Sequence, residues 1–232
     1  DLSELVAHSL RELGVSTEWY MAREPQAGRG ESRPYLGQVA HVPPAWGGSR
    51  LGRLLNRNSY WASDQAGLAT AGTARFDVIQ VRDKYLAALV ALMVARITRK
   101  KFVYWCSFPY PEYALETGRH VGGAKGALLR LKGWPAAWLL YRVVMPRADH
   151  CFVQSEQMRD DLAEEHGIAR ASMTPVPMGV AQRLLDWSGE RRLDQGTGIV
   201  PGRVLYLGTL SAVRRLEGVI YAFARVRARC PH

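Results

Sequence analysis

The spacing of hydrophobic positions along this chain predicts alternating strands and helices. From Phe76 onward, the mostly apolar runs FDVIQV, FVYWC, HCFVQ and MTPVPMG alternate with stretches whose apolar residues recur at helical spacing. Runs of the first kind are typical of strands and those of the second kind of amphipathic helices. This alternation favours the α/β class with a doubly wound parallel sheet. Because FDVIQV is nearly all apolar, we expect it to be buried on both faces of the sheet.

Several residues mark where the expected helices begin and end. Asp83 is suited to N-cap a helix from Tyr85 to about Arg99, because its carboxylate can accept from the free N–H groups of the first turn. Pro135 suits the first turn of a later helix. Ser155 is expected to cap the helix EQMRDDLAEEH, and Gly167 to end it.

The two ends of the chain suggest a division into domains. LSELVAHSLRELG predicts a helix closed by Gly14, and VSTEWYMA then alternates like a strand. We therefore expect the α/β pattern to begin before Asp1. DWSGERRLDQGTGIVPG interrupts the pattern as a linker does, and the strand-like RVLYLG follows it. This predicts a first domain over residues 1–198, with the linker at its end, and the beginning of a second α/β domain over residues 199–232.

Composition narrows the functional classes only partly. The chain is 47% hydrophobic and 22% charged, as in ordinary globular proteins. A formal net charge of +10 favours an anionic partner, which could be nucleic acid, an anionic membrane surface or a phosphorylated small molecule. The three cysteines form no CxxC pair, which favours a reducing cytoplasm. The most apolar segment, YLAALVALMVA, is too short to span a bilayer as a helix.

Two strand ends carry the pattern of a phosphate-binding site. In open α/β sheets ligands bind beyond the carboxyl ends of the strands. Gly179 and Gly208 each follow such a strand and allow the backbone to approach a ligand closely. Arg214 and Arg215 then add positive charge near an expected helix N-terminus, which itself attracts anions. The alternative is a plain βα turn with solvated arginines, and neither GxGxxG nor GxxxxGK[ST] occurs.

The order of these segments resembles a known enzyme family. ADHCFVQSEQMRDDLAEEHGI, MTPVPMGV, a linker and VLYLGTLSAVRRLEGVIYAFARVRARCP together resemble glycosyltransferase family 4 (group 1), from about Phe76 to the last residue. These GT-B-fold enzymes have two Rossmann-like domains, an N-terminal one chiefly for the acceptor and a C-terminal one for the nucleotide-sugar donor. The resemblance implies an acceptor domain followed by a truncated first βα unit of the donor domain.

The resemblance also implies an activity and a donor site. The activity would be a hexosyltransferase-type transfer, generally retaining, for glycan, polysaccharide or glycolipid synthesis. The expected donor-diphosphate residues are Gly179, Gly208, Thr209, Arg214 and Arg215. Thr209 stands where the family often has arginine, and Arg214 stands where it has lysine. Arginines and a helix N-terminus stabilise a leaving diphosphate electrostatically, so we expect no metal and no other cofactor. The family's pair of glutamates is expected beyond His232, so the fragment alone should be inactive.

The acceptor side departs from the family pattern. Many members carry a histidine after the strand equivalent to FVYWC, whereas this chain has the Pro-rich loop SFPYPE. Ser107, Tyr110 and Glu112 are therefore the candidate acceptor-side residues. Glu112 is the nearest titratable group and a candidate partner for an acceptor hydroxyl; the alternative, which is commoner for a glutamate in a Pro-rich loop, is that it is simply exposed.

Three alternatives stay open at this point. Residues 125–148, which include Trp134 and Trp138, could form an interfacial patch that receives a lipid-linked acceptor at the cytoplasmic membrane face, or a core-facing helix with solvated arginines. A non-catalytic module that binds a sugar nucleotide or a partner would share the same fold. A nucleic-acid binder is disfavoured, because the tryptophans fall mostly in hydrophobic runs instead of among the basic residues.

Overall fold

The computed structural model describes residues 10–20, 31–35, 38–42, 67–73, 75–179, 186, 202–208, 214 and 216–230. The chain divides into two compact units, which are described separately. One comprises Asp1–Phe108 with Trp138–Ala181, and the other Pro109–Ala137 with Gln182–His232. The predicted domain boundary between residues 198 and 199 falls outside the described residues and stays a prediction.

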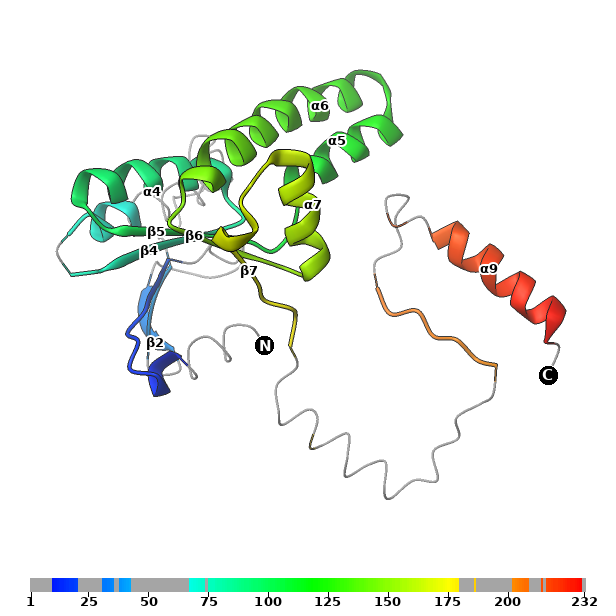
Figure 1. The fold of residues 1–232 in the computed structure, drawn as a ribbon, viewed down its shortest axis with the longest axis horizontal. Coiled ribbons are helices and arrows are strands. Elements are labelled where there is room, and N and C mark those ends of the chain that lie inside the picture. Colours follow the sequence, from blue (N-terminus) through cyan, green and yellow to red (C-terminus); the bar gives the residue numbers. More distant parts are fainter. Residues whose placement is uncertain are drawn as a thin grey trace. The chain divides into compact units, whose positions relative to one another are not determined.

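A four-stranded parallel sheet forms the centre of the first unit (Figure 1). Its strands are β4 (Val78–Arg82), β5 (Lys101–Cys106), β6 (His150–Val153) and β7 (Met173–Pro175), hydrogen-bonded in that order. All neighbouring pairs are parallel. The predicted α/β class with a parallel, Rossmann-like sheet is therefore confirmed.

The two faces of this sheet are buried to different extents. Residues in register on neighbouring parallel strands share a face. The covered face forms the core and carries Ile79, Phe102, Tyr104, Cys106, Cys151, Val153 and Met173, all of them buried. The opposite face is more open, and Val78 is 51% exposed there. The expectation that FDVIQV is buried on both faces is therefore wrong, because β4 alternates between covered and open positions.

Helix α4 (Tyr85–Thr98) covers part of the core face and contacts β4 and β5. It buries small residues, including Ala88, Ala91 and Ala95, which allow the helix axis to approach the sheet. The predicted cap is wrong: Lys84 occupies the N-cap position, and no side chain caps the helix there. Asp83 has φ 59°, in the left-handed region that aspartate tolerates better than most residues, and its side chain has other partners.

Helices α5 (Tyr110–Val121) and α6 (Gly123–Trp138) form a hairpin in the second unit (Figure 1). Glycines bring the two backbones together. A Cβ built at Gly118 would lie 2.8 Å from the carbonyl oxygen of Gly126, and one at Gly133 would lie 2.9 Å from Cγ of Leu115. The hairpin is thus held by close backbone packing that larger residues could not allow.

The predicted position of Pro135 in a first helical turn is wrong. Pro135 lies inside α6, which begins twelve residues earlier at Gly123. Proline has no N–H to donate to the carbonyl of Leu131, and its ring crowds that carbonyl. Soon after it the backbone continues as a π-helical segment, η1 (Leu139–Val144), and then as a 3-10 turn, η2 (Met145–Arg147). We attribute this irregular ending to the proline.

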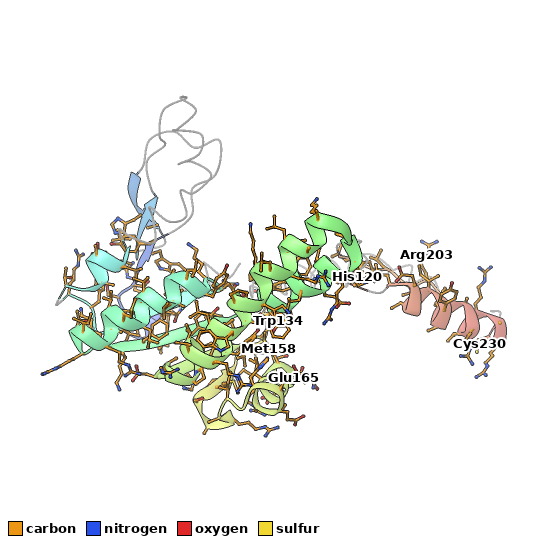
Figure 2. The ribbon with its side chains drawn as sticks, turned by 90° about the horizontal axis from the view of Figure 1, so that it is seen from above. His120, Trp134, Met158, Glu165, Arg203 and Cys230 are labelled. Atoms are coloured by element: carbon orange, nitrogen blue, oxygen red, sulfur yellow. The ribbon has the colours of Figure 1, made fainter. Side chains whose placement is uncertain are left out.

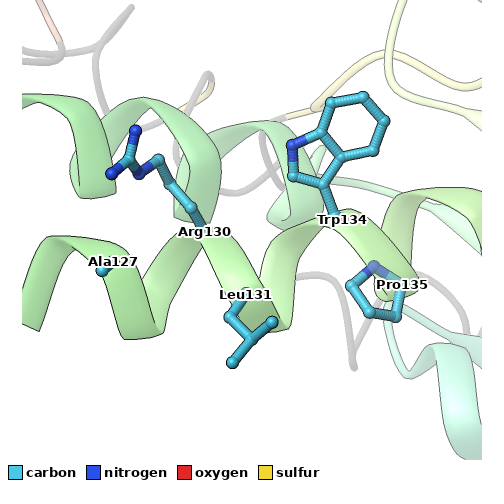
Figure 3. Close-up of a pocket in the computed structure, with 5 residues that line it drawn as sticks. All are labelled: Ala127, Arg130, Leu131, Trp134 and Pro135. Atoms are coloured by element: carbon cyan, nitrogen blue, oxygen red, sulfur yellow. The ribbon is translucent and has the colours of Figure 1, made fainter.

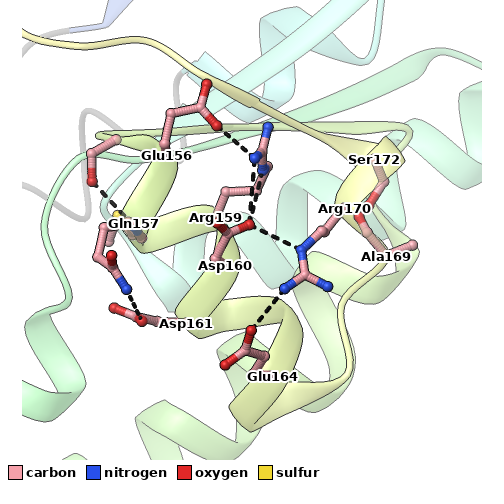
Figure 4. Close-up of polar contacts among 11 residues, drawn as sticks. Glu156, Gln157, Arg159, Asp160, Asp161, Glu164, Ala169, Arg170 and Ser172 are labelled. Atoms are coloured by element: carbon pink, nitrogen blue, oxygen red, sulfur yellow. Dashed lines mark hydrogen bonds and ion pairs between the residues drawn. The ribbon is translucent and has the colours of Figure 1, made fainter.

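Helix α7 (Glu156–His166) confirms both predicted ends. The Ser155 hydroxyl accepts a hydrogen bond from the Met158 N–H at 3.1 Å, and Gly167 ends the helix with φ 70°. On the outer surface Arg170, from the 3-10 turn η3 (Arg170–Ser172), donates to Asp160 and Glu164, each at 2.9 Å (Figure 4). The Arg170 guanidinium holds the pKa of Asp160 below its usual value.

A second, three-stranded sheet was not predicted as a separate sheet. It contains β1 (Glu18–Tyr20), β2 (Glu31–Tyr35) and β3 (Gln38–Val42), with β3 parallel to β1 and antiparallel to β2. The carboxylate of Glu18 pairs with His41 at 3.2 Å and also with Arg75. Gly14 has φ 78°, consistent with the predicted helix end.

The described C-terminal residues contain helix α9 (Leu216–Arg229), of which no residue is buried. Within the described part of the chain, residues 203–207 have no strand partner. A strand needs a neighbour to complete its hydrogen bonds, so the prediction that RVLYLG forms a strand is wrong for the residues that the structure describes here. Among the described residues, no helix combines the length and the hydropathy needed to cross a bilayer.

Candidate functional site

A polar cluster lies where β4 and β5 end. Arg82 is the last residue of β4, Asp83 follows it, and Ser107 comes directly after β5. Because the two strands are parallel neighbours, their carboxyl ends lie at the same edge of the sheet. This edge is where open α/β sheets bind their ligands.

Asp83 ties the two strand ends together. Its Oδ1 accepts hydrogen bonds from the backbone N–H of Ser107 at 2.7 Å and of Phe108 at 3.3 Å. Its Oδ2 accepts a short hydrogen bond from the Ser107 hydroxyl. The Asp83 N–H in turn donates to the Trp105 carbonyl at 3.0 Å. With its carboxylate engaged in this way, Asp83 is suited to hold the loop in place and unsuited to act as a general base.

Arg82 completes the cluster from the open face of the sheet. Its Nε and Nη2 both donate to the Ser107 hydroxyl oxygen at 3.2 Å. Its Cζ lies 5.3 Å from the centre of the Trp105 ring, within cation–π range. The side chain is still 42% exposed, and among the described residues no hydrogen bond is formed by Nη1. Arg82 therefore presents a positioned cationic donor at this edge of the sheet.

Aromatic side chains continue this face away from Arg82. Trp105 packs edge-on against Phe152 with 5.7 Å between ring centres, and Phe152 packs against His150 at 5.5 Å. The His150 ring is fixed by a 2.8 Å hydrogen bond with Thr174. Trp105 is only 8% exposed, and its indole N–H lacks a hydrogen-bond partner within the described structure. A buried donor without a partner is costly to the fold.

The chemistry available at this edge is therefore binding and orientation. The Arg82 guanidinium is the exposed donor, and the buried Trp105 ring lies beneath it within cation–π range. Such a combination suits a polyhydroxylated or anionic molecule. Within the described ranges, no group of three or more His, Cys, Asp or Glu side chains could hold a metal ion.

Of the three predicted acceptor-side residues, one lies in the polar cluster and two lie in helix α5. Ser107 lies in the cluster, with its hydroxyl held by Arg82 and Asp83. Tyr110 begins α5, and Glu112 lies in the first turn of that helix. The prediction that Glu112 sits in a Pro-rich loop is wrong, because Pro111 fits the first turn and allows the helix to start inside SFPYPE.

The predicted donor-side residues are only partly described. Gly179 is exposed, and a Cβ there would have no neighbour within 4 Å. Gly208 packs more closely, since a Cβ there would lie 2.6 Å from the Tyr206 hydroxyl oxygen. Arg214 is exposed and stands two residues before α9. Thr209 and Arg215 lie outside the described residues. The roles of all five in donor binding stay predictions.

Sequence reasoning missed Arg82 and Trp105 and gave Asp83 the wrong role. The available signal was the position of these residues in the sequence. VRDK lies at the carboxyl end of one predicted strand, and YWCS lies at the carboxyl end of the next predicted strand. Parallel strands that are consecutive in sequence often pair, which would have brought these polar residues to one edge. The contacts of Asp83 could not be distinguished from an N-cap, because both uses place an aspartate just before a helix.

Comparison with known proteins identifies relatives for most of the chain. Residues 3–179 match the family model described as "Glycosyl transferase 4-like domain". The chain is also 27% identical over 164 residues to the glycogen synthases of two strains of Mycobacterium tuberculosis. That alignment covers 71% of this chain and 36% of each relative. The chain thus spans well under half the length of the curated proteins that it matches.

Proposed function

The chain belongs to the glycosyl transferase 4-like domain family, and from this premise we propose that it is the acceptor side of a glycosyltransferase. The complete protein would transfer a hexose from a nucleotide sugar to a glycan or a lipid-linked acceptor, with retention of anomeric configuration. The match over residues 3–179 is the observation that carries the proposal. The similarity to glycogen synthases supports polysaccharide synthesis as one setting.

On the acceptor side, we assign substrate contact to the edge formed by Arg82, Trp105 and Ser107. The Arg82 guanidinium would donate to acceptor oxygens, and the buried Trp105 ring would hold that guanidinium in place. Ser107 and Asp83 would act as positioning residues, because their polar atoms already hold the loop to the strand. Glu112, in the first turn of α5, is retained as the candidate partner of the acceptor hydroxyl.

On the donor side, Gly179, Gly208, Thr209, Arg214 and Arg215 are proposed to surround the diphosphate. Negative charge develops on the leaving diphosphate as the glycosidic bond breaks, and fixed cations stabilise it without a metal. The free N–H groups at the start of α9 add to this effect. Glu217 lies in the first turn of α9, where its negative charge weakens the attraction of these N–H groups for a diphosphate. The proposed site therefore depends on Arg214 and Arg215 for its positive charge.

The proposed setting is the cytoplasm, with peripheral access to the cytoplasmic membrane face. Cys106 and Cys151 are buried free thiols, and Cys230 is an exposed one, which fits a reducing compartment. A formal net charge of +10 favours anionic substrates or surfaces. Nucleic acid is not a proposed partner.

Calorimetric titration of the complete protein, extended beyond His232, with UDP- and GDP-sugars tests the proposal. We expect one of these donors to bind, and Arg214→Ala/Arg215→Ala to abolish that binding. The pair Arg227→Ala/Arg229→Ala at the far end of α9 is the matched control and should leave it intact. Failure of a folded protein to bind any nucleotide sugar would contradict the proposal. Binding without turnover would favour the non-catalytic module instead.

A further inference from the structure

Helix α6 places its small residues inside and its large apolar residues outside. Gly126, Gly133 and Ala136 are buried. Leu131 and Trp134 are each 71% exposed, and Trp138, the last residue of the helix, is 62% exposed. Helices that serve a protein core show the reverse arrangement. The sequence-based alternative of a core-facing helix is therefore wrong for these side chains of α6. It is confirmed for the following segment, where Leu140, Val144 and Met145 are buried while the arginines are exposed.

The α5–α6 hairpin does not need these large side chains for its own packing. Its contact is made through glycine backbones, as the close approach of Gly118 to Gly126 shows. The stem of Arg130 also packs over Gly118, where an added Cβ would lie 2.8 Å from the arginine Cγ. The apolar residues on the outer side are consequently available to another surface.

The outer side of α6 is a continuous apolar stripe with a shallow hollow. Residues 127, 131, 134 and 138 recur at helical spacing and share this side. The hollow is lined by Ala127, Arg130, Leu131, Trp134 and Pro135 (Figure 3). Trp134, labelled in Figure 2, is among the most exposed large apolar side chains of α6. Exposed tryptophan and leucine at adjacent positions are unusual on a surface with no partner.

Positive charge borders this stripe, which we call the α6 stripe. Lys125 and Lys132 are seven positions apart and therefore lie on one flank of α6, beyond the exposed Leu128. Arg130 lies on the other flank, beside Trp134. All three cations are exposed. The 16 residues of α6 include no aspartate or glutamate. A partner must therefore offer apolar volume flanked by negative charge.

We propose that the α6 stripe lies on an anionic lipid surface. A bilayer with anionic headgroups offers both features at once: phosphates for the cations and the acyl boundary for leucine and tryptophan. Tryptophan is enriched at this depth of the membrane. At 1.5 Å per residue α6 is about 24 Å long, too short to cross the hydrocarbon core, so it lies in the plane of the interface.

Vesicle co-sedimentation of the full chain tests this surface without any sugar substrate. The probes are vesicles of phosphatidylcholine alone and vesicles in which about a third of the lipid is phosphatidylglycerol, a composition with a negative surface potential. We expect binding to the anionic vesicles and weak binding to the neutral ones. Leu131→Gln/Trp134→Gln should lower the partition coefficient by about tenfold or more, because apolar area is no longer buried.

Matched variants separate apolar insertion from charge. Ile97→Gln removes an 82% exposed apolar side chain from α4 and should leave binding unchanged. Lys125→Gln/Lys132→Gln should weaken binding to anionic vesicles several-fold, since each cation near such a surface contributes. Arg227→Gln/Arg229→Gln, an exposed pair on α9, should have a smaller effect. Circular dichroism of each variant checks that it is folded.

Tryptophan fluorescence with brominated lipids tests insertion in the unmodified chain. We expect quenching that is largely lost in Trp134→Phe. No binding to anionic vesicles would overturn the proposal, and so would binding that Leu131→Gln/Trp134→Gln leaves unchanged, because charge alone would then explain it. A loss of self-association in that variant, with no vesicle binding by the unmodified chain, would instead assign the α6 stripe to a protein contact.

Discussion

The carboxylate of Asp83 accepts a hydrogen bond from the backbone N–H of Ser107 at 2.7 Å, across 24 positions of sequence. This contact joins the ends of β4 and β5 and fixes the loop that follows β5. Arg82 shares the Ser107 hydroxyl with Asp83, so the position of the cation depends on the same contact. The candidate ligand-binding edge is in this sense built around a single carboxylate.

Asp83→Ala should therefore weaken the fold and loosen the edge together. The variant leaves the N–H groups of Ser107 and Phe108 without their acceptor, and hydrogen bonds to charged groups contribute about 1.5–3 kcal/mol. The side chain is partly exposed, so we expect the lower end of this range for the loss in free energy of unfolding. Urea unfolding measures it. Asp83→Asn keeps one acceptor and should lose less; an equal loss in the two variants would contradict this role.

Gly118→Ala should separate α5 from α6. Its Cβ would meet the backbone of Gly126, which cannot move aside as a side chain can. Overpacking of this kind costs about 1–3 kcal/mol, against a gain of up to about 1 kcal/mol in helix propensity. We expect a net loss by thermal or urea unfolding. Gly218→Ala in α9 has open space around it and is the control, expected to be neutral or stabilising.

Asp149 should make stability depend on acidity. The Phe102 N–H, at 2.9 Å, and then Lys101, at 3.0 Å, hold the pKa of Asp149 below its ordinary value of 3.8. A carboxyl whose pKa is lower in the folded state stabilises the fold above its unfolded pKa, and loses that contribution as the pH falls through the folded pKa. Asp149→Asn should therefore be less stable at neutral pH, and the difference should shrink on acidification below pH 3.8. A difference independent of pH would contradict this.

The three cysteines should differ sharply in reactivity. Burial raises the pKa of the Cys151 thiol to about 12, so it stays protonated and shielded. Cys106 is also buried, whereas Cys230 is exposed. Because the thiolate is the reactive species, iodoacetamide at mildly alkaline pH should modify Cys230 alone in the folded chain. Mass spectrometry before and after denaturation measures this, and early modification of Cys151 would show that the core opens.

The sequence predicted features that depend on neighbouring residues. Ser155 and Gly167 mark the ends of α7 correctly, because capping signals act within one helical turn. The parallel sheet followed from the alternation of strand and helix patterns. By contrast, the open face of β4 was missed, since a run of apolar residues does not reveal how many faces are covered.

The site and the hairpin depended on contacts that local patterns do not contain. An aspartate before a helix predicts a cap, yet the Asp83 carboxylate accepts hydrogen bonds from the backbone N–H groups of Ser107 and Phe108, which follow the next strand. Gly126 and Gly133 are seven positions apart and lie on the side of α6 that packs against α5. Periodicity alone showed an amphipathic helix, and only the position of α5 shows which side is inside.

Sugar transfer by the complete protein tests the central claim most directly. Labelled nucleotide sugars would be supplied with cell-derived glycan and lipid fractions, and incorporation of label would be measured for the unmodified protein and for Arg82→Ala. We predict incorporation that falls at least about tenfold in Arg82→Ala, since misplaced substrates lose this much, while binding of the nucleotide sugar alone is unchanged. Transfer that Arg82→Ala leaves intact would contradict the assignment of the acceptor edge. Donor binding without transfer to any fraction would contradict the activity itself.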